Sequence, residues 1–336
     1  MPSQALTSTS AQNSKSFRTW TSCQKFWFAR IDARPLALFR IATGILCFFM
    51  FLALIPNWSR FFSPDGIISL TAPGLENARV NSSLGLFYWT DAFIPVEAFC
   101  LIAIGVSITY IFGIYTRIST FLLLVLLDAM VHRNPYIVNG EELVLRMCLL
   151  YCLFIDLGRV WSWDSWRRKL QHKESECTLF AWPVRMMQIN IALIYAISLP
   201  YKFVQDPGWV TGDALHWTVA SDMWGPSTMP WITLAFGGLL RKIMTFGTVI
   251  VEGSFPLLVW FKPTRLAVLL PLAGLHIGIA LMIPNVTFFT LSMVCVFACY
   301  LTGRDIDWIK HWAIWFYKKC FSTGQAKVLA HSTTNY

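Results

Sequence analysis

Ionisable side chains interrupt several apolar segments, and these are the residues whose chemistry needs an explanation. Arg146 lies within one apolar run, Lys202 closes another, and Glu252 and His276 each lie near the middle of a further run. A charged group in hydrocarbon costs roughly 3 kcal/mol or more unless it is paired or hydrated. The sequence therefore predicts mutual pairing, bound water or a ligand around these four residues, and a functional site is the first hypothesis.

Each of these residues also has a purely structural interpretation. Arg146 with Glu252 would suit an ion pair between helices, and His276 would suit a hydrogen-bonded core histidine. Lys202 would also suit a residue at the membrane surface whose long side chain reaches the headgroups. Arg40, near the inner end of the first apolar run, is expected to reach the headgroups in the same way.

The composition places all of these residues in a membrane protein. Of the 336 residues 56% are hydrophobic and 13% are charged, and the mean hydropathy is +0.54, values that favour an integral membrane protein over a soluble one. The net charge of +9 comes from Lys and Arg in short loops, so it does not indicate nucleic-acid binding. Six of the nine cysteines lie in apolar runs and are interpreted as packing residues, and no metal site is predicted. These six are Cys47, Cys100, Cys148, Cys152, Cys295 and Cys299.

The elements that must position the ionisable residues are membrane-spanning helices. Eight apolar runs are long enough to cross about 30 Å of hydrocarbon. They are residues 36–55, 94–113, 117–132, 142–158, 183–201, 243–261, 265–283 and 286–302. The predicted fold is therefore all-α, a polytopic integral membrane bundle of about eight transmembrane helices.

The basic residues set the expected orientation of this bundle. Lys and Arg concentrate before the first run, after the fourth, between the sixth and seventh, and after the eighth, which predicts cytoplasmic termini. Residues 1–30 are expected to form a disordered cytoplasmic tail with the start of an amphipathic segment, 31–303 the transmembrane domain, and 304–336 a cytoplasmic tail. The loops 56–93, 133–141 and 202–242 then face outward. Two of these loops are too long for simple connections and are expected to cover or line a site.

Three blocks of sequence resemble the vitamin K-dependent gamma-carboxylase-like family, also called the horizontally transferred transmembrane domain family. The first block runs from Arg133 to Arg146 and closes on Trp161-Ser162-Trp163-Asp164. The second contains Arg185, Gln188, Asn190, Tyr195, Lys202, Trp209, Gly212, Asp213, Ala214 and Leu215. The third joins Glu252-Gly253-Ser254-Phe255-Pro256-Leu257 to His276-Ile277-Gly278, and the opening segment 32–44 also fits.

The expected site opens to the outer face of a bacterial inner (plasma) membrane, because the predicted topology places several ionisable residues in the outer thirds of their spans. These residues are Glu97, Asp128, His132, Arg133, Arg146 and Lys202. In that family a lysine deprotonates a reduced quinone, dioxygen then attacks, and the oxygenated quinone serves as a strong base; Lys202 matches that lysine. The implied catalytic residues are Lys202 and His276. The implied quinol or substrate pocket contains Arg133, Asn139, Glu142, Arg146, Trp209 and Glu252.

Two functions remain open at this point. The first is a quinol-dependent oxygenase, epoxidase or carboxylase-like enzyme that uses a reduced quinone of the vitamin K or menaquinone type. The second is a non-redox maturation or export factor that uses the same bundle as a binding scaffold. The expected partners are the lipid bilayer, a quinol and a peptide or protein substrate, and a small-solute transporter is disfavoured because no inverted repeat of broken helices is found.

Overall fold

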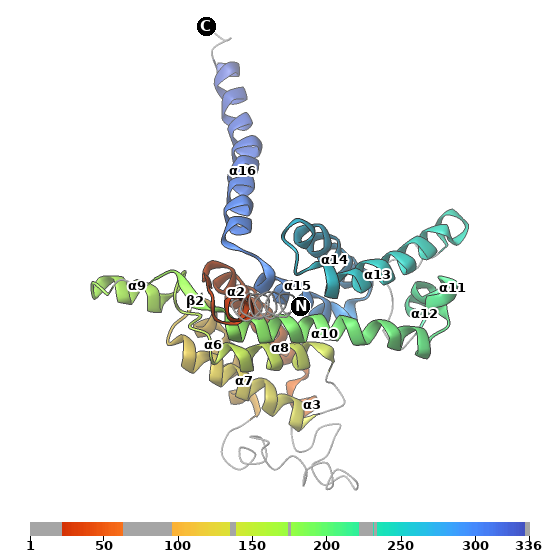
Figure 1. Ribbon diagram of the computed structural model, residues 1–336, viewed down its shortest axis with the longest axis horizontal. Helices are drawn as coiled ribbons and strands as arrows, with labels where there is room; N and C mark the ends of the chain where they lie inside the picture. Colours follow the sequence, from red (N-terminus) through yellow and green to blue (C-terminus); the bar gives the residue numbers. More distant parts are fainter. Residues whose placement is uncertain are drawn as a thin grey trace, which may run out of the picture.

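The protein is built from helices, with one short two-stranded ribbon (Figure 1). The computed structural model describes residues 22–62, 96–134, 139–173, 176–221, 231 and 234–332. The longer helices are α2 (Arg34–Leu54), α6 (Val96–Phe112), α7 (Thr116–Arg133), α8 (Gly140–Cys152), α10 (Ala181–Gln205), α13 (Leu239–Leu258), α14 (Lys262–Met282), α15 (Thr287–Val296) and α16 (Gly303–Ser332). Shorter elements are β1 (Arg30–Asp32), α3 (Trp58–Phe62), α9 (Trp163–Leu170), β2 (Thr178–Phe180), α11 (Gly208–Thr211), α12 (Ala214–Ala220) and the 3-10 helices η1 (Ile55–Asn57), η4 (Ala235–Gly238), η5 (Pro284–Val286) and η6 (Phe297–Tyr300).

Three stretches of helix among the described residues are long and apolar enough to cross a membrane. They are Arg34–Phe62, Ala181–Gln205 and Lys262–Met282, with 29, 25 and 21 residues. A fourth arises if the bent pair Pro284–Tyr300 and Gly303–Lys319 is counted as one span. The chain is therefore a helical membrane protein, as its composition predicts.

Four predicted spans correspond to helices that are shorter or more charged. Helix α6 has 17 residues and α8 has 13. Helix α7 carries Arg117, Asp128 and Arg133, and α13 carries two basic residues and Glu252. Helix α8 ends at Cys152 and not at the predicted residue 158. The backbone N–H groups of Phe154 and Ile155 donate to the carbonyl oxygens three residues earlier, as in a 3-10 helix, and the chain turns there. Eight crossings therefore stay a prediction.

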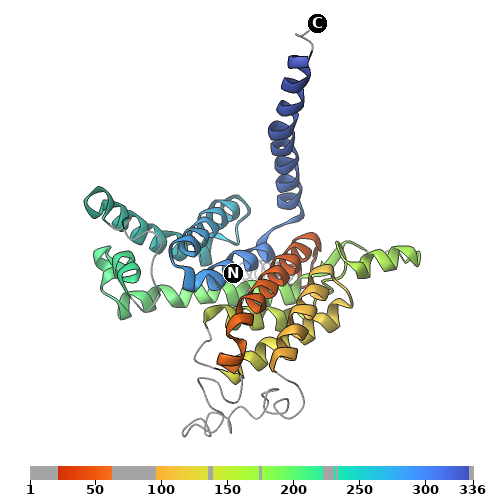
Figure 2. The ribbon, with the colours of Figure 1, turned by 180° about the vertical axis from the view of Figure 1, so that it is seen from behind.

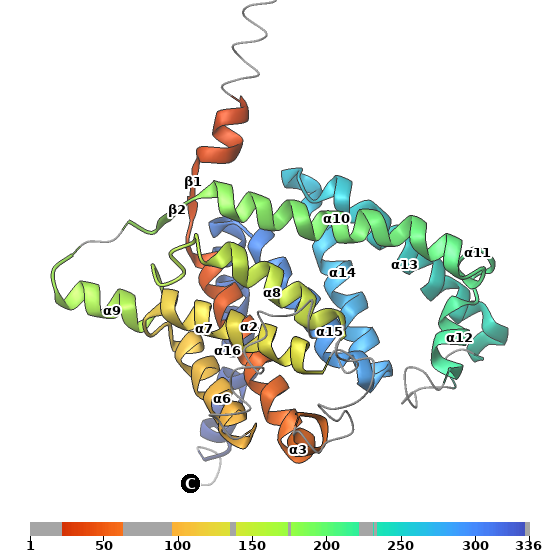
Figure 3. The ribbon, with the colours of Figure 1, turned by 90° about the horizontal axis from the view of Figure 1, so that it is seen from below.

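Connections that are distant in sequence meet at one end of the bundle, which we call the ribbon end because β1 and β2 pair there (Figure 3). The ribbon joins the start of α2 to the start of α10. Arg34 forms ion pairs with Asp32 at 2.8 Å and with Asp307 of α16 at 2.5 Å. Burial would raise the pKa of Asp32, but the hydrogen bonds and charge of Arg34 outweigh it and leave that pKa below its ordinary value.

Arg40 ties the loop that follows α8 to the same end. Its guanidinium is fully buried and donates to the carbonyl oxygens of Leu157 at 2.9 Å and Trp161 at 2.5 Å. The expectation that Arg40 reaches the headgroups is therefore wrong. A buried guanidinium is stable here because it satisfies carbonyl groups that no helix uses.

The Trp161–Asp164 segment completes this arrangement. The Asp164 carboxylate accepts hydrogen bonds from the backbone N–H of Tyr115 at 2.9 Å and of Thr116 at 2.7 Å, so it caps the start of α7. The turn before α7 needs Gly113, whose φ is +66° and where a Cβ would lie 2.5 Å from Nη1 of Arg40. The Trp161–Asp164 part of the first block is thus explained by fold stability.

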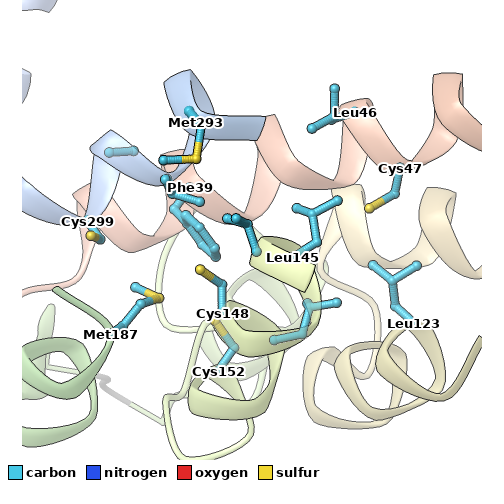
Figure 4. Close-up of a cluster of buried hydrophobic side chains, with 14 of the residues drawn as sticks. Phe39, Leu46, Cys47, Leu123, Leu145, Cys148, Cys152, Met187, Met293 and Cys299 are labelled. Carbon is cyan, nitrogen blue, oxygen red and sulfur yellow. The ribbon is translucent and has the colours of Figure 1, made fainter. Parts of the chain in front are cut away.

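The core between the helices is packed with aliphatic, aromatic and thiol side chains. Phe39, Leu145, Cys148, Met187 and Met293 come from four different helices and lie together in Figure 4. The cysteines at 47, 100, 148, 152 and 299 are buried and unpaired, and Cys295 is half-buried. Their interpretation as packing residues is confirmed.

The C-terminal segment differs from a simple tail. Residues 303–332 form α16, which projects away from the other helices and carries the C-terminus with it (Figures 1 and 2). The predicted disordered tail and the first outward loop lie mostly outside the described residues. The predicted loop 202–242 contains the end of α10 and then α11, α12 and η4.

Candidate functional site

Lys202 and Glu252 form an ion pair between two helices. Lys202 lies in the last turn of α10 and Glu252 lies in the second half of α13, and the two helices pack together. The Glu252 side chain is 7% exposed and the Lys202 side chain 23%. Removing both groups from water is costly, so each depends on the other for its charge to persist at this depth.

Trp209 covers the Lys202 ammonium. The Nζ atom lies 4.5 Å from the centre of the indole ring, within the range of a cation–π interaction. Helix α10 ends at Gln205 because Asp206 is extended before Pro207, as expected for a residue that precedes proline. The Asp206 carboxylate accepts the N–H of Gly208 at 2.7 Å, which starts α11 and brings Trp209 back over Lys202.

Helices α11 and α12 are held against α13. Arg241 donates to the Asp213 carboxylate at 2.8 Å, and the N–H of Leu215 donates to the hydroxyl of Thr245 at 3.3 Å. Gly212 allows the turn between them with a φ of +84°. Figure 3 shows both short helices at the far end of α10. The second block of family resemblance therefore has a positional role, which is to place Trp209.

His276 and Tyr195 form a second polar pair close to the first. The Tyr195 hydroxyl and Nε2 of His276 are 2.7 Å apart, and both side chains are buried. Nδ1 of His276 is buried and has no hydrogen-bond partner among the described residues. The rings of Phe255 and Phe297 surround Tyr195, with ring centres at 4.8 and 6.3 Å.

The two pairs lie on the same neighbouring helices. Tyr195 and Lys202 belong to α10, and Phe255, one turn after Glu252 on α13, packs against the Tyr195 ring with the ring centres 4.8 Å apart. Phe255 follows Glu252 by three residues on α13, and Tyr195 precedes Lys202 by seven on α10, so each helix presents both of its residues on one face. The structure thus brings together four of the predicted site residues, Lys202, Trp209, Glu252 and His276.

Arg146 belongs to a different cluster. Its guanidinium pairs with Asp128 of α7 at 2.6 Å, and Asp128 also lies 3.3 Å from His132. The expected grouping of Arg146 with Glu252 is therefore wrong. Helix α8 packs against α7, which supplies a nearer carboxylate, while Glu252 pairs with Lys202.

Two other predicted pocket residues, Asn139 and Glu142, stand at the start of α8. The backbone N–H of Asn139 donates to the Glu142 carboxylate at 3.0 Å, which is half of a capping box. The Asn139 amide also reaches Glu141 at 3.4 Å. Arg133 is the last residue of α7, and its side chain lies outside the described atoms. Among the described residues no hydrogen bond or ion pair joins this cluster to Lys202.

Tyr195 belongs to the second block of resemblance but is not among the predicted catalytic or pocket residues. A signal existed, because Tyr195 precedes Lys202 by two helical turns and must share its face. Asp128 and His132 were expected in one cavity with Arg146, and they do lie beside it, but the ion pair of Arg146 with Asp128 was not predicted. The sequence gives no sign of which helices are neighbours.

Comparison with known proteins gives no further assignment, because no family model, no curated protein and no solved structure matches the chain. The resemblance to the gamma-carboxylase-like family therefore rests on the residues of the three blocks, and the site is assigned from its own geometry.

Proposed function

We propose that this protein is a membrane enzyme that takes a proton from a reduced quinone at the Lys202–Glu252 pair. The observation that carries the proposal is a nearly buried lysine–glutamate pair with the Trp209 ring over the ammonium. Ionisable residues at such depth are costly and are retained mainly for function. The quinone itself is proposed from the family resemblance.

The two residues of the ion pair have different roles in the proposed reaction. The ammonium of an ion pair has no lone pair with which to take a proton, so the carboxylate is the partner that can accept one. In our proposal the quinol O–H bond breaks, its electron pair stays on the oxygen, and the proton passes to the Glu252 carboxylate. The Lys202 ammonium then faces the quinolate oxygen and stabilises its negative charge. His276 and Tyr195 orient the quinol ring. Nδ1 of His276, which has no hydrogen-bond partner among the described residues, can bind a polar group of the quinol.

The test is a reaction of the purified protein with reduced menaquinone or reduced vitamin K in the presence of oxygen. We expect oxygen-dependent consumption of the quinol and an epoxide product in the mass spectrum. The same protein after heat unfolding is the control for spontaneous oxidation. If the folded and unfolded samples consume quinol at the same rate, the proposal fails, and a scaffold for maturation or export becomes the better function.

We also propose that the bundle crosses a bacterial inner membrane eight times with both termini in the cytoplasm. The support is the ribbon end, where the chain before α2 meets the loop after α8, the start of α10 and the start of α16. These four points lie before the first, after the fourth, before the fifth and after the eighth predicted span. If all eight helices cross the membrane, the four points lie on the same side of it.

A labelling experiment tests this topology. Cysteine at exposed Gln171, in the turn after α9, is expected to be shielded from an impermeant thiol reagent in intact cells. Cysteine at exposed Thr211 of α11 is expected to react. Both variants are made in a background without native cysteines and are labelled again after lysis as a control. Labelling of residue 171 but not 211 in intact cells would show the inverted orientation.

A further inference from the structure

Helix α16 exposes a set of large aromatic side chains. Trp308, Trp312 and Trp315 are 56, 54 and 49% exposed, and Phe316 is 50% exposed. The helix stands clear of the rest of the chain in both views of its length (Figures 1 and 2). Exposed aromatic groups of this size mark a surface that meets another phase or partner.

The aromatic residues of α16 gather on one face, and three of its basic residues lie on the other. At 100° per residue, Trp308, Ile309, Trp312 and Phe316 share one side of the helix. Lys310, His311 and Lys318 lie on the other side. Lys319 lies on the aromatic side, with Nζ 4.9 Å from the ring centre of Trp315, and its long side chain can extend from there to the headgroups. This is the pattern of a helix that lies in a membrane interface, with tryptophan in the lipid and lysine toward water.

The charge along α16 has a single sign beyond its base. Its two acidic residues, Asp305 and Asp307, lie in the first turns and pair with Arg265 at 3.7 Å and Arg34 at 2.5 Å. From Trp308 to the last residue the sequence contains four lysines and no Asp or Glu. The positive charge of the helix beyond Asp307 is therefore complementary to an anionic surface.

The direction of α16 also suits that surface. Its axis turns by 116° from the axis of the preceding Pro284–Tyr300 segment. That is about 26° beyond a right angle, and transmembrane helices tilt by up to about 40° from the bilayer normal. If Pro284–Tyr300 crosses the membrane, the axis of α16 runs nearly parallel to the bilayer surface. The ion pairs to Arg34 and Arg265 hold its base at the ribbon end.

We propose that α16 lies on the surface of the membrane that the bundle spans and binds its anionic phospholipids. The Trp308–Trp312–Phe316 side enters the acyl boundary, and the lysines contact lipid phosphates. This inference is independent of the quinol chemistry, because it uses none of the residues of the Lys202 site. It adds a lipid-binding surface of defined charge to the protein.

Two adjacent positions test the depth of the helix. In a background without native cysteines, a spin label at Trp312→Cys reports the aromatic side, and one at His311→Cys is the matched control on the polar side. In nanodiscs of equal parts phosphatidylcholine and phosphatidylglycerol, we expect residue 312 to collide with oxygen in the lipid and residue 311 with an aqueous nickel chelate. Equal collision of both labels with the chelate would overturn the proposal. Dipolar coupling between labels on two chains would instead assign the face to a second copy and also overturn it.

The charge requirement is tested on the chain with its native cysteines. Each basic side chain near an anionic leaflet strengthens binding roughly fivefold. We therefore expect trypsin to cleave after Lys310 at least about tenfold more slowly in the mixed discs than in discs of phosphatidylcholine alone. The variant Lys318→Gln/Lys319→Gln keeps the Lys310 cleavage site and should lose most of this difference. Equal cleavage of the native chain in the two kinds of disc would contradict anionic lipid binding.

Discussion

Replacement of Lys202 by methionine is expected to abolish quinol oxidation and to destabilise the protein. The change leaves the Glu252 carboxylate, which is only 7% exposed, without its ion-pair partner. Breaking a buried pair from one side costs about 3–5 kcal/mol. The loss of a positioned charge and of proton transfer lowers the rate by about 10²-fold or more. The measurements are the oxygen-dependent quinol assay and thermal unfolding of the same preparations.

The double variant Lys202→Met/Glu252→Leu separates the two effects. Apolar groups in place of both partners remove the unpaired charge, so most of the stability should return while activity stays absent. Glu252→Gln keeps a hydrogen-bond acceptor for Lys202 but cannot accept the quinol proton at its amide. We expect it to be inactive and to lose less stability than Lys202→Met, because the Lys202 ammonium is 23% exposed and keeps an acceptor.

Two further variants complete this series. Lys173→Met, at an exposed position after α9, is the control for loss of a positive charge and should change stability by less than about 0.5 kcal/mol. Lys202→Arg retains the charge and cannot act as a base, because arginine stays protonated. Residual activity in that variant would support an electrostatic role for position 202. Full activity in Lys202→Met or in Glu252→Gln would show that the pair only stabilises the fold.

Replacement of Arg40 by methionine is expected to cause the largest loss of stability outside the site. The guanidinium is fully buried and donates hydrogen bonds to the carbonyl oxygens of Leu157 and Trp161. Each carbonyl left without a donor costs about 1–3 kcal/mol, and the sum is a large part of the stability of an ordinary domain. Arg40→Lys should recover little, since one ammonium lacks the planar fork that reaches two separate acceptors.

A thiol-reactive dye measures this loss, because five described cysteines are buried and become reactive on unfolding. Exposed Cys23 and Cys177 set the signal of the folded state. Arg117→Met, at an exposed position in the first turn of α7, is the matched control and should leave the unfolding midpoint nearly unchanged. Similar small shifts for both variants would restore the view that Arg40 reaches the headgroups.

The sequence by itself determined the class of the fold and the helices that carry its polar residues. Apolar runs predicted α2, α10 and α14 within a few residues, since a helix must cross hydrocarbon with its backbone satisfied internally. The same periodicity placed Lys202 at the end of one helix and Glu252 and His276 within two others. The burial of the cysteines followed from their position in those runs.

Only the tertiary structure decided which polar groups meet. Glu252 pairs with Lys202 and not with Arg146, because α13 packs against α10 while α8 packs against α7. Arg40 is buried and not exposed to headgroups because a turn after Cys152 brings two carbonyl groups to it. Local sequence fixes the face and depth of a side chain, through the helical repeat and the cost of burial. Its partner depends on the order in which helices pack, and that order is set by the fit of side chains from distant segments.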